Sequence, residues 1–154
     1  MNIGIENQKR EAVAENLQQL LADEMLIYVK TRNYHWNIEA INFSELHSFY
    51  EEQYIELEQI IDEVAERIRM LGHMSIGTMK DFLSYTHLSE QEYTTDAQEQ
   101  LNQLINDQEA IIRFLRKCGR IFDEEYDDLG SSDFVIALME QHEKMRWMLA
   151  SHQA

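Results

Sequence analysis

The sequence contains no proline among its 154 residues and only five glycines. Proline breaks a helix interior and glycine weakens it, so a chain with so little of either can form long uninterrupted helices. Apolar residues also recur with helical spacing, for example at Val13, Leu17, Leu20 and Ile27. These features predict an all-α protein.

Four long segments carry this helical pattern: residues 6–34, residues 43–71, a segment that begins at Thr95, and residues 133–151. Residues 73–93 interrupt it and contain a short helical segment at 79–84. One long crossover between the second and third helices predicts the ferritin-like variant of the four-helix bundle. A cytokine-type bundle needs two long crossovers, and the other connections are too short for that. We expect one domain over residues 1–154.

Two of the helix starts have capping signals. Thr95 and Gln98 form a T-x-x-Q capping box for the third helix, and Ser131 or Ser132 is the expected cap of the fourth. Gly72 is the expected residue just beyond the end of the second helix.

Charge and cysteine content restrict the function. Thirteen basic and 29 acidic side chains give a net charge of −16, which repels nucleic acid and anionic membranes and attracts cations. No apolar run approaches the roughly 20 residues that a membrane-spanning helix needs, and we find no signal-peptide pattern. Cys118 is the only cysteine, so no internal disulfide can form. We therefore expect a cytoplasmic protein.

The stretch 33–72 carries the candidate chemistry. It contains His35 and His47, twelve residues apart, and the pair Asp62 and Glu66, four residues apart. At about 100° per residue, His47, Glu51, Asp62 and Glu66 fall along one stripe of the second helix. Carboxylates with imidazole suit iron, manganese or zinc, and the absence of thiolates argues against a Cys-type zinc site.

The spacing of this stripe prevents one chain from closing the site. His47 and Asp62 are fifteen residues apart, or about 22 Å along a helix at about 1.5 Å per residue. Two antiparallel copies that cross near Ile55 would instead place His47 of one beside Asp62 of the other, and a two-fold axis would create two such sites. We expect Phe49 and Ile60 on the side of the helix that faces away from the bundle core, where they would support this contact.

A di-iron site within one bundle is poorly supported. Such bundles use Glu-x-x-His motifs, and no glutamate stands three residues before any of the six histidines. Glu24 lies on the apolar face of the first helix, and a hydrogen-bonded core acid is the favoured interpretation over a metal ligand. We expect His73, His87, His142 and His152 to be structural or exposed.

Three segments resemble one protein family: YHWN at 34–37, NFSELH at 42–47 and DEVAERIRMLG at 62–72. They are similar to the Dps family (DNA protection during starvation), the mini-ferritins. The resemblance implies a hollow homo-oligomeric shell of twelve subunits. It also implies a ferroxidase that oxidises Fe²⁺, preferably with H₂O₂, keeps ferric iron inside and protects against oxidative damage. No haem is expected.

The resemblance also assigns roles to residues. His35 and His47 would be metal ligands from one subunit, and Asp62 and Glu66 would come from its two-fold partner. Glu51 stands where many relatives have aspartate, and Trp36 matches a tryptophan that can donate electrons and trap radicals. Acidic residues near the start of the fourth helix would line three-fold pores for cations; the candidates are Asp128 and Asp133, with Asp123 and Glu124 as outer members.

Three alternatives remain open. The first is a DNA-compacting protein of the same fold, but direct DNA binders of the family usually carry a lysine-rich tail. Here only Lys9 and Arg10 precede the core of the first helix, so we expect no appreciable DNA binding. The second is a haem-containing bacterioferritin-like protein. The third is a helical interaction module on which the metal-like stripe is accidental.

Overall fold

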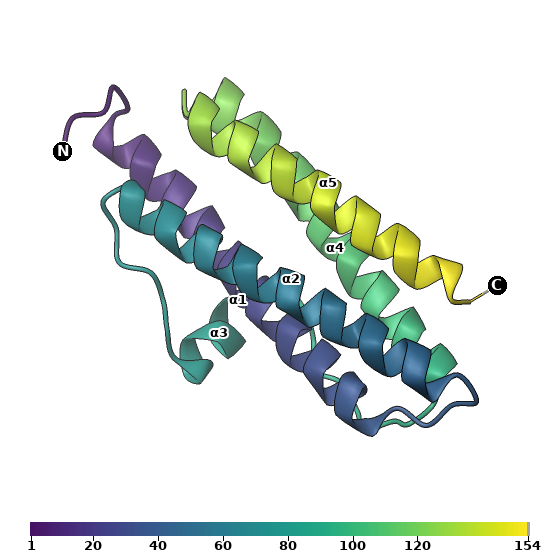
Figure 1. Cartoon of the computed structure of the whole chain (residues 1–154). Helices are drawn as coiled ribbons and strands as arrows, with labels where there is room; N and C mark the ends of the chain where they lie inside the picture. The colour runs from purple at the N-terminus through teal and green to yellow at the C-terminus, as the bar shows by residue number, and fades with distance from the viewer. Residues whose placement is uncertain (154) are drawn as a thin grey trace.

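The computed structural model describes residues 1–153 and contains helices in the order that the sequence predicts. They are α1 (Asn7–Asn37), α2 (Phe43–Met70), α3 (Met79–Tyr85), α4 (Ala97–Glu124) and α5 (Leu129–Ser151). The four long helices form a bundle in which α1 packs beside α2 and α4 packs beside α5 (Figure 1). The predicted all-α fold, with a short helix in the long crossover, is confirmed.

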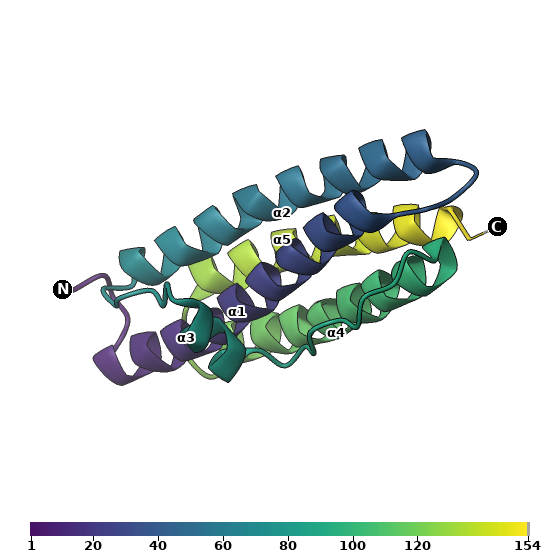
Figure 2. The ribbon, with the colours of Figure 1, turned by 90° about the horizontal axis from the view of Figure 1, so that it is seen from below.

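The crossover runs from the end of α2 back along the bundle to the start of α4, and it carries α3 (Figure 2). Asp23 of α1 is buried and anchors it. Its Oδ1 accepts hydrogen bonds from Thr86 Oγ1 at 2.6 Å and from the His87 amide at 2.7 Å. At the far end, the Glu39 amide donates to the Thr95 carbonyl at 3.1 Å, which ties the α1–α2 loop to the beginning of α4.

The helix ends correct two of the predicted caps. Helix α4 begins after Asp96, whose carboxylate accepts from the Glu99 amide at 2.9 Å, so the capping box at Thr95 is wrong. Helix α5 begins at Leu129, and its cap is Asp128 rather than a serine. In both places an aspartate carboxylate reaches the free amide three residues ahead. The prediction for Gly72 agrees with its positive φ of 91° just beyond α2.

Apolar faces of all four long helices meet in one core. Gly119 permits close contact between α4 and α5, because a Cβ there would lie 3.1 Å from Ile136 Cγ1. Phe49 and Ile60 are buried in this core at 6% and 1% exposure, so their predicted outward placement is wrong. Ile55, by contrast, is 46% exposed on α2. Among residues 1–153, we find no helix long and apolar enough to cross a membrane.

Candidate metal site

His35 and His47 meet where α1 ends and α2 begins. Their rings stack with centroids 3.7 Å apart and planes 18° apart. Each ring also bonds to the other residue's backbone: His35 Nδ1 lies 2.7 Å from the His47 carbonyl oxygen, and His47 Nδ1 lies 2.8 Å from the His35 carbonyl oxygen. His35 is in the last turn of α1, where carbonyl groups lack helical partners. The short loop thus brings both rings into a reciprocal arrangement.

This reciprocity fixes the tautomer of both histidines. A carbonyl oxygen can only accept a hydrogen bond, so both Nδ1 atoms carry a proton. A neutral ring of this kind has its lone pair on Nε2, which is the form that binds metal ions. Within residues 1–153, neither Nε2 atom has a hydrogen-bond partner. Two imidazole nitrogens are therefore held ready as ligands.

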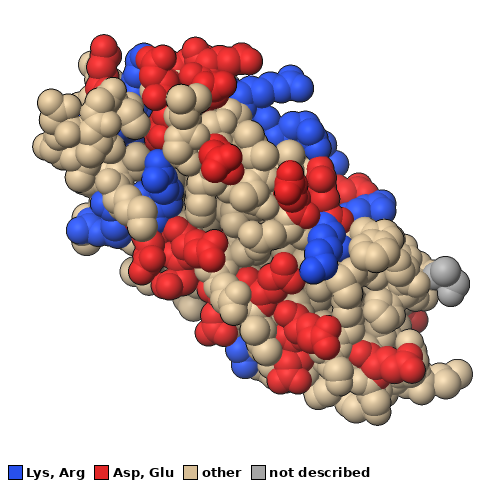
Figure 3. All heavy atoms as spheres, turned by 45° about the horizontal axis from the view of Figure 1, so that its top comes forward, with Lys and Arg blue, Asp and Glu red and all other residues tan. Residues whose placement is uncertain are grey.

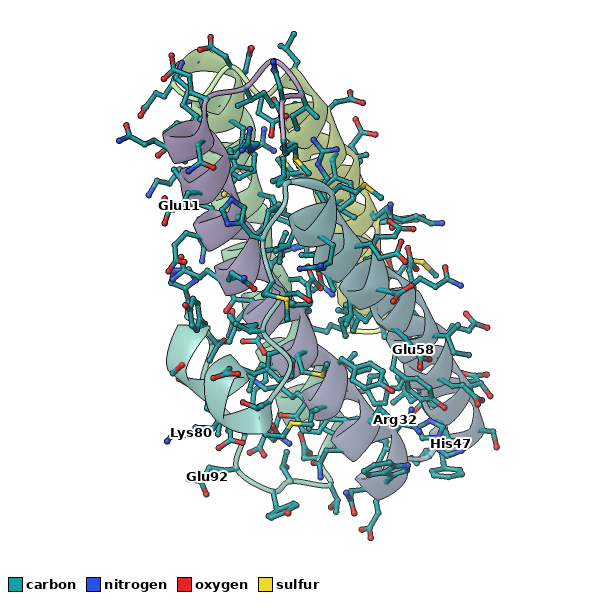
Figure 4. The ribbon with its side chains drawn as sticks, turned by 90° about the vertical axis from the view of Figure 1, so that its left-hand side faces the viewer. Glu11, Arg32, His47, Glu58, Lys80 and Glu92 are labelled. Carbon is teal, nitrogen blue, oxygen red and sulfur yellow. The ribbon has the colours of Figure 1, made fainter. Side chains whose placement is uncertain are left out.

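Aromatic and cationic side chains surround the pair. The Tyr54 ring contacts His35 edge-on, with centroids 5.3 Å apart, and its hydroxyl donates to Glu51 Oε1 at 3.2 Å. Arg32 lies over the Tyr54 ring at 4.4 Å and donates to the Tyr28 hydroxyl at 2.7 Å. Burial raises the pKa of the Tyr54 phenol, and its hydrogen bond to Glu51 raises that pKa further. Figure 4 shows Arg32 and His47 near the same end of the α1–α2 pair.

The acidic candidates lie along α2 and do not join the histidines within the chain. Glu51, Asp62 and Glu66 are all exposed. Across residues 1–153, no three His, Cys, Asp or Glu side chains are placed to hold a metal ion together. One chain thus presents the two imidazoles, with Glu51 one turn from His47, at one end of α2 and the carboxylates of Asp62 and Glu66 towards the other end.

A shallow groove of about 570 Å³ lies on the same outer face of α1 and α2. Asp62 lines it, as does Ile55, the residue near which two antiparallel copies are predicted to cross. The other lining residues are Met25, Tyr28, Glu58, Gln59, Ile61 and Ala65. Apolar and acidic side chains are therefore both available on this face to a second helix.

Comparison with known proteins identifies the family. A ferritin-like domain model matches residues 14–154. The chain is 33% identical over 137 residues to DNA protection during starvation protein 2 of Bacillus anthracis, a match that covers 89% of this chain and 93% of that protein. It is 40% identical over 152 residues to an uncharacterised low temperature-induced protein of Nostoc sp., covering 98% and 85%.

The fold gives the same result. The crystal structure of a Dps protein from Vibrio cholerae O1 matches with a TM-score of 0.94 and 29% identity, covering 100% of this chain and 96% of that one. The chain belongs to the Dps family of ferritin-like proteins.

Of the pore candidates in this Dps chain, Asp128 has a structural task. It is 1% exposed, and besides capping α5 it accepts from Ser131 Oγ at 2.5 Å and from Arg67 Nη2 at 3.2 Å. Its carboxylate is thus held inside the chain. Asp123, Glu124 and Asp133 are exposed at the same end of the α4–α5 pair. The carboxylates of these three residues are open to solvent.

Two features of the Dps chain escaped sequence analysis. Tyr54 and Arg32 next to the histidines were not singled out, although Tyr54 lies seven residues after His47 and hence on the same helix face.

The second feature is a buried pair, in which His142 Nε2 lies 2.8 Å from Glu24 Oε1. His142 is spaced with Leu138, Met145 and Leu149, and that spacing could have placed it in the core. Trp36, the tryptophan that the resemblance assigns to the site, is 63% exposed.

Proposed function

We propose that this Dps protein is a ferroxidase that oxidises Fe²⁺, preferably with H₂O₂, at sites between two subunits, and that it stores the ferric product in a hollow shell of twelve subunits. The observation that carries the proposal is the locked His35–His47 pair with both Nε2 atoms free. The similar proteins support the proposal only by showing that this chain belongs to the Dps family.

In this proposal each site combines two half-sites. His35 and His47 bind Fe²⁺ from one subunit, and Asp62 and Glu66 bind it from the two-fold partner. Glu51 is a further carboxylate ligand. Oxygen donors favour Fe³⁺ over Fe²⁺, so the carboxylates favour oxidation, while the imidazoles help to bind the ferrous ion on arrival. The exposed acids and the groove on α1 and α2 are consistent with a partner helix on that face.

Charge favours iron over DNA as the partner. Acidic side chains are spread over the face shown in Figure 3, and the net charge is −16. The two basic residues near the start of α1 are already engaged: Lys9 pairs with Asp127, and Arg10 is buried and donates to the Ile5 carbonyl at 2.9 Å. We propose that cations enter past Asp123, Glu124 and Asp133 and that plain duplex DNA is not bound at physiological salt.

Mixed assemblies test this function and the shared site together. One variant carries His35→Ala and His47→Ala, and the other carries Asp62→Asn and Glu66→Gln. Each should form shells and lose peroxide-driven iron oxidation. When the two variants co-assemble, about half of the pairs are mixed, and each mixed pair keeps one intact site of two. About a quarter of the wild-type activity should therefore return.

The measurement is ferric absorbance after Fe²⁺ and peroxide are added to shells purified by size. Each variant assembled alone is the matched control. Wild-type activity in the histidine variant would show that these residues are not the site. Co-assembled shells with no recovered activity would contradict the sharing of ligands between subunits. A wild-type protein that stays monomeric and leaves iron in solution would refute the function as a whole.

A further inference from the structure

We infer that Tyr54 is a redox-active residue of the site and supplies one electron to peroxide when a single ferrous ion is bound. This inference rests on the proposed iron oxidation. It starts from the position of Tyr54, whose ring is in edge-on contact with His35, a proposed ligand. Among the aromatic side chains of residues 1–153, His47 and Tyr54 are the two in ring contact with His35.

The hydrogen bond of Tyr54 gives its proton a destination. A phenol loses an electron readily only if it loses its proton at the same time, because the radical cation is a very strong acid. The Tyr54 hydroxyl donates to Glu51 Oε1 at 3.2 Å, so a carboxylate base is already in place. Tyr54 is only 9% exposed, which shields a radical there from solutes.

The electron count explains when such a donor is needed. Reduction of one H₂O₂ to two water molecules takes two electrons and two protons, and one Fe²⁺ gives one electron. Tyr54 gives the second electron, and its proton moves to Glu51 and on to the peroxide oxygen. One further proton comes from water. The products are Fe³⁺, a neutral tyrosyl radical, two water molecules and the hydroxide ion left by the water that gave the proton, and no hydroxyl radical is released.

Arg32 connects Tyr54 to a second oxidisable ring. Its guanidinium lies 4.4 Å from the Tyr54 centroid and 5.6 Å from the Trp36 centroid. A fixed positive charge over the Tyr54 ring opposes a radical cation and favours the neutral radical that results from proton loss to Glu51. Trp36 is 63% exposed, so an oxidising equivalent that reaches it can be quenched by reductants in solution.

The test uses assembled wild-type shells loaded with less than one Fe²⁺ per site, mixed with excess H₂O₂ and frozen within milliseconds. Electron paramagnetic resonance should show a tyrosyl radical. Tyr54→Phe should reduce that signal at least tenfold. Tyr28→Phe is the matched control, because Tyr28 belongs to the same cluster and bonds to Arg32 but does not touch the His35 ring. It should retain the signal.

A second variant separates redox chemistry from a positioning role. Fluorotyrosine at position 54 keeps the hydroxyl and its bond to Glu51 but changes the hyperfine pattern of a radical on that ring. A changed pattern supports the inference, even if Tyr54→Phe also weakens Fe²⁺ binding. An unchanged pattern, or a full signal in Tyr54→Phe, contradicts it. Wild-type shells that oxidise Fe²⁺ without any radical on Tyr54 would refute this inference alone, whereas shells that oxidise no iron would refute the proposed function.

Discussion

His142 Nε2 lies 2.8 Å from Glu24 Oε1 inside the bundle, and neither side chain has exposed surface. His142 Nδ1 is 2.6 Å from Gln108 Oε1, an oxygen that only accepts, so Nδ1 carries a proton. The contact on the Nε2 side needs one proton between the two partners, because two lone pairs would otherwise face each other. Its angles fall outside hydrogen-bond geometry, so the attraction is mainly electrostatic. Glu24 and His142 therefore depend on each other.

We expect Glu24→Leu to destabilise the chain by about 3–5 kcal/mol, because it leaves His142 buried without its partner. Glu24→Gln should cost less, since its amide can donate to a neutral Nε2 at almost unchanged volume. Urea unfolding followed by circular dichroism measures both.

Glu143→Gln is the control for this pair, because Glu143 forms an exposed ion pair with Arg116 and should contribute about 0–1 kcal/mol. If the Glu24→Leu variant is at least as stable as the Glu143→Gln variant, Glu24 and His142 do not depend on each other.

Asp128 and Asp133 should behave differently although they are five residues apart. Asp128→Ala removes the cap of α5 and a partner of Arg67, and we expect a loss of about 2–3 kcal/mol in unfolding free energy. Asp133→Ala lies on the surface and should change it by no more than about 0.5 kcal/mol. If Asp133 lines a pore, its variant should instead slow iron uptake into intact shells. Equal stability of the two variants would argue against a structural role for Asp128.

Asp23 should control the mobility of the crossover. Asp23→Ala removes the acceptor of Thr86 Oγ1 and of the His87 amide, so this segment should open more readily, by about 2–3 kcal/mol. Hydrogen exchange at the His87 amide measures the opening. Glu90→Ala, an exposed change in the same connection, is the control. Unchanged protection in the Asp23 variant would show that packing alone holds the crossover.

Cys118 should be unreactive in the folded protein, because burial raises the pKa of its thiol to about 12. Labelling by a thiol reagent at pH 8 should be about a thousandfold slower than in the unfolded chain, since only the thiolate reacts. Comparable rates in the two states would contradict this.

The same thiol predicts a dependence of stability on pH. Above about pH 9 the unfolded chain loses the thiol proton while the folded chain keeps it, so this contribution to the unfolding free energy falls as the pH rises from about 9 to about 12. Cys118→Ala should have a smaller decrease over that range. Identical pH profiles of the two proteins would rule out the contribution.

Much of the fold was predictable because its signals are local. The absence of proline, the helical spacing of apolar residues and the long segment after Gly72 were enough to predict four helices and a crossover. The caps were predicted less well, because several cap-type side chains stand near each helix start: Asp96 follows Thr95, and Asp128 precedes Ser131 and Ser132. Only the folded backbone decides which of them reaches a free amide. Phe49 and Ile60 were placed on the wrong face, since both lie at the edge of the apolar stripe of the second helix, where a small angular error on a wheel moves a side chain from the core to the surface.

The sequence by itself determined the fold class and the number of residues between His47 and Asp62, which is too large for one helix to close on an ion. Tertiary structure decided what those residues do. Only the packed α1–α2 pair brings His35 to His47 and fixes their tautomers through backbone carbonyls, and only it places Tyr54 between His35 and Glu51. Backbone acceptors and ring contacts depend on three-dimensional position, which residue spacing along one helix does not specify.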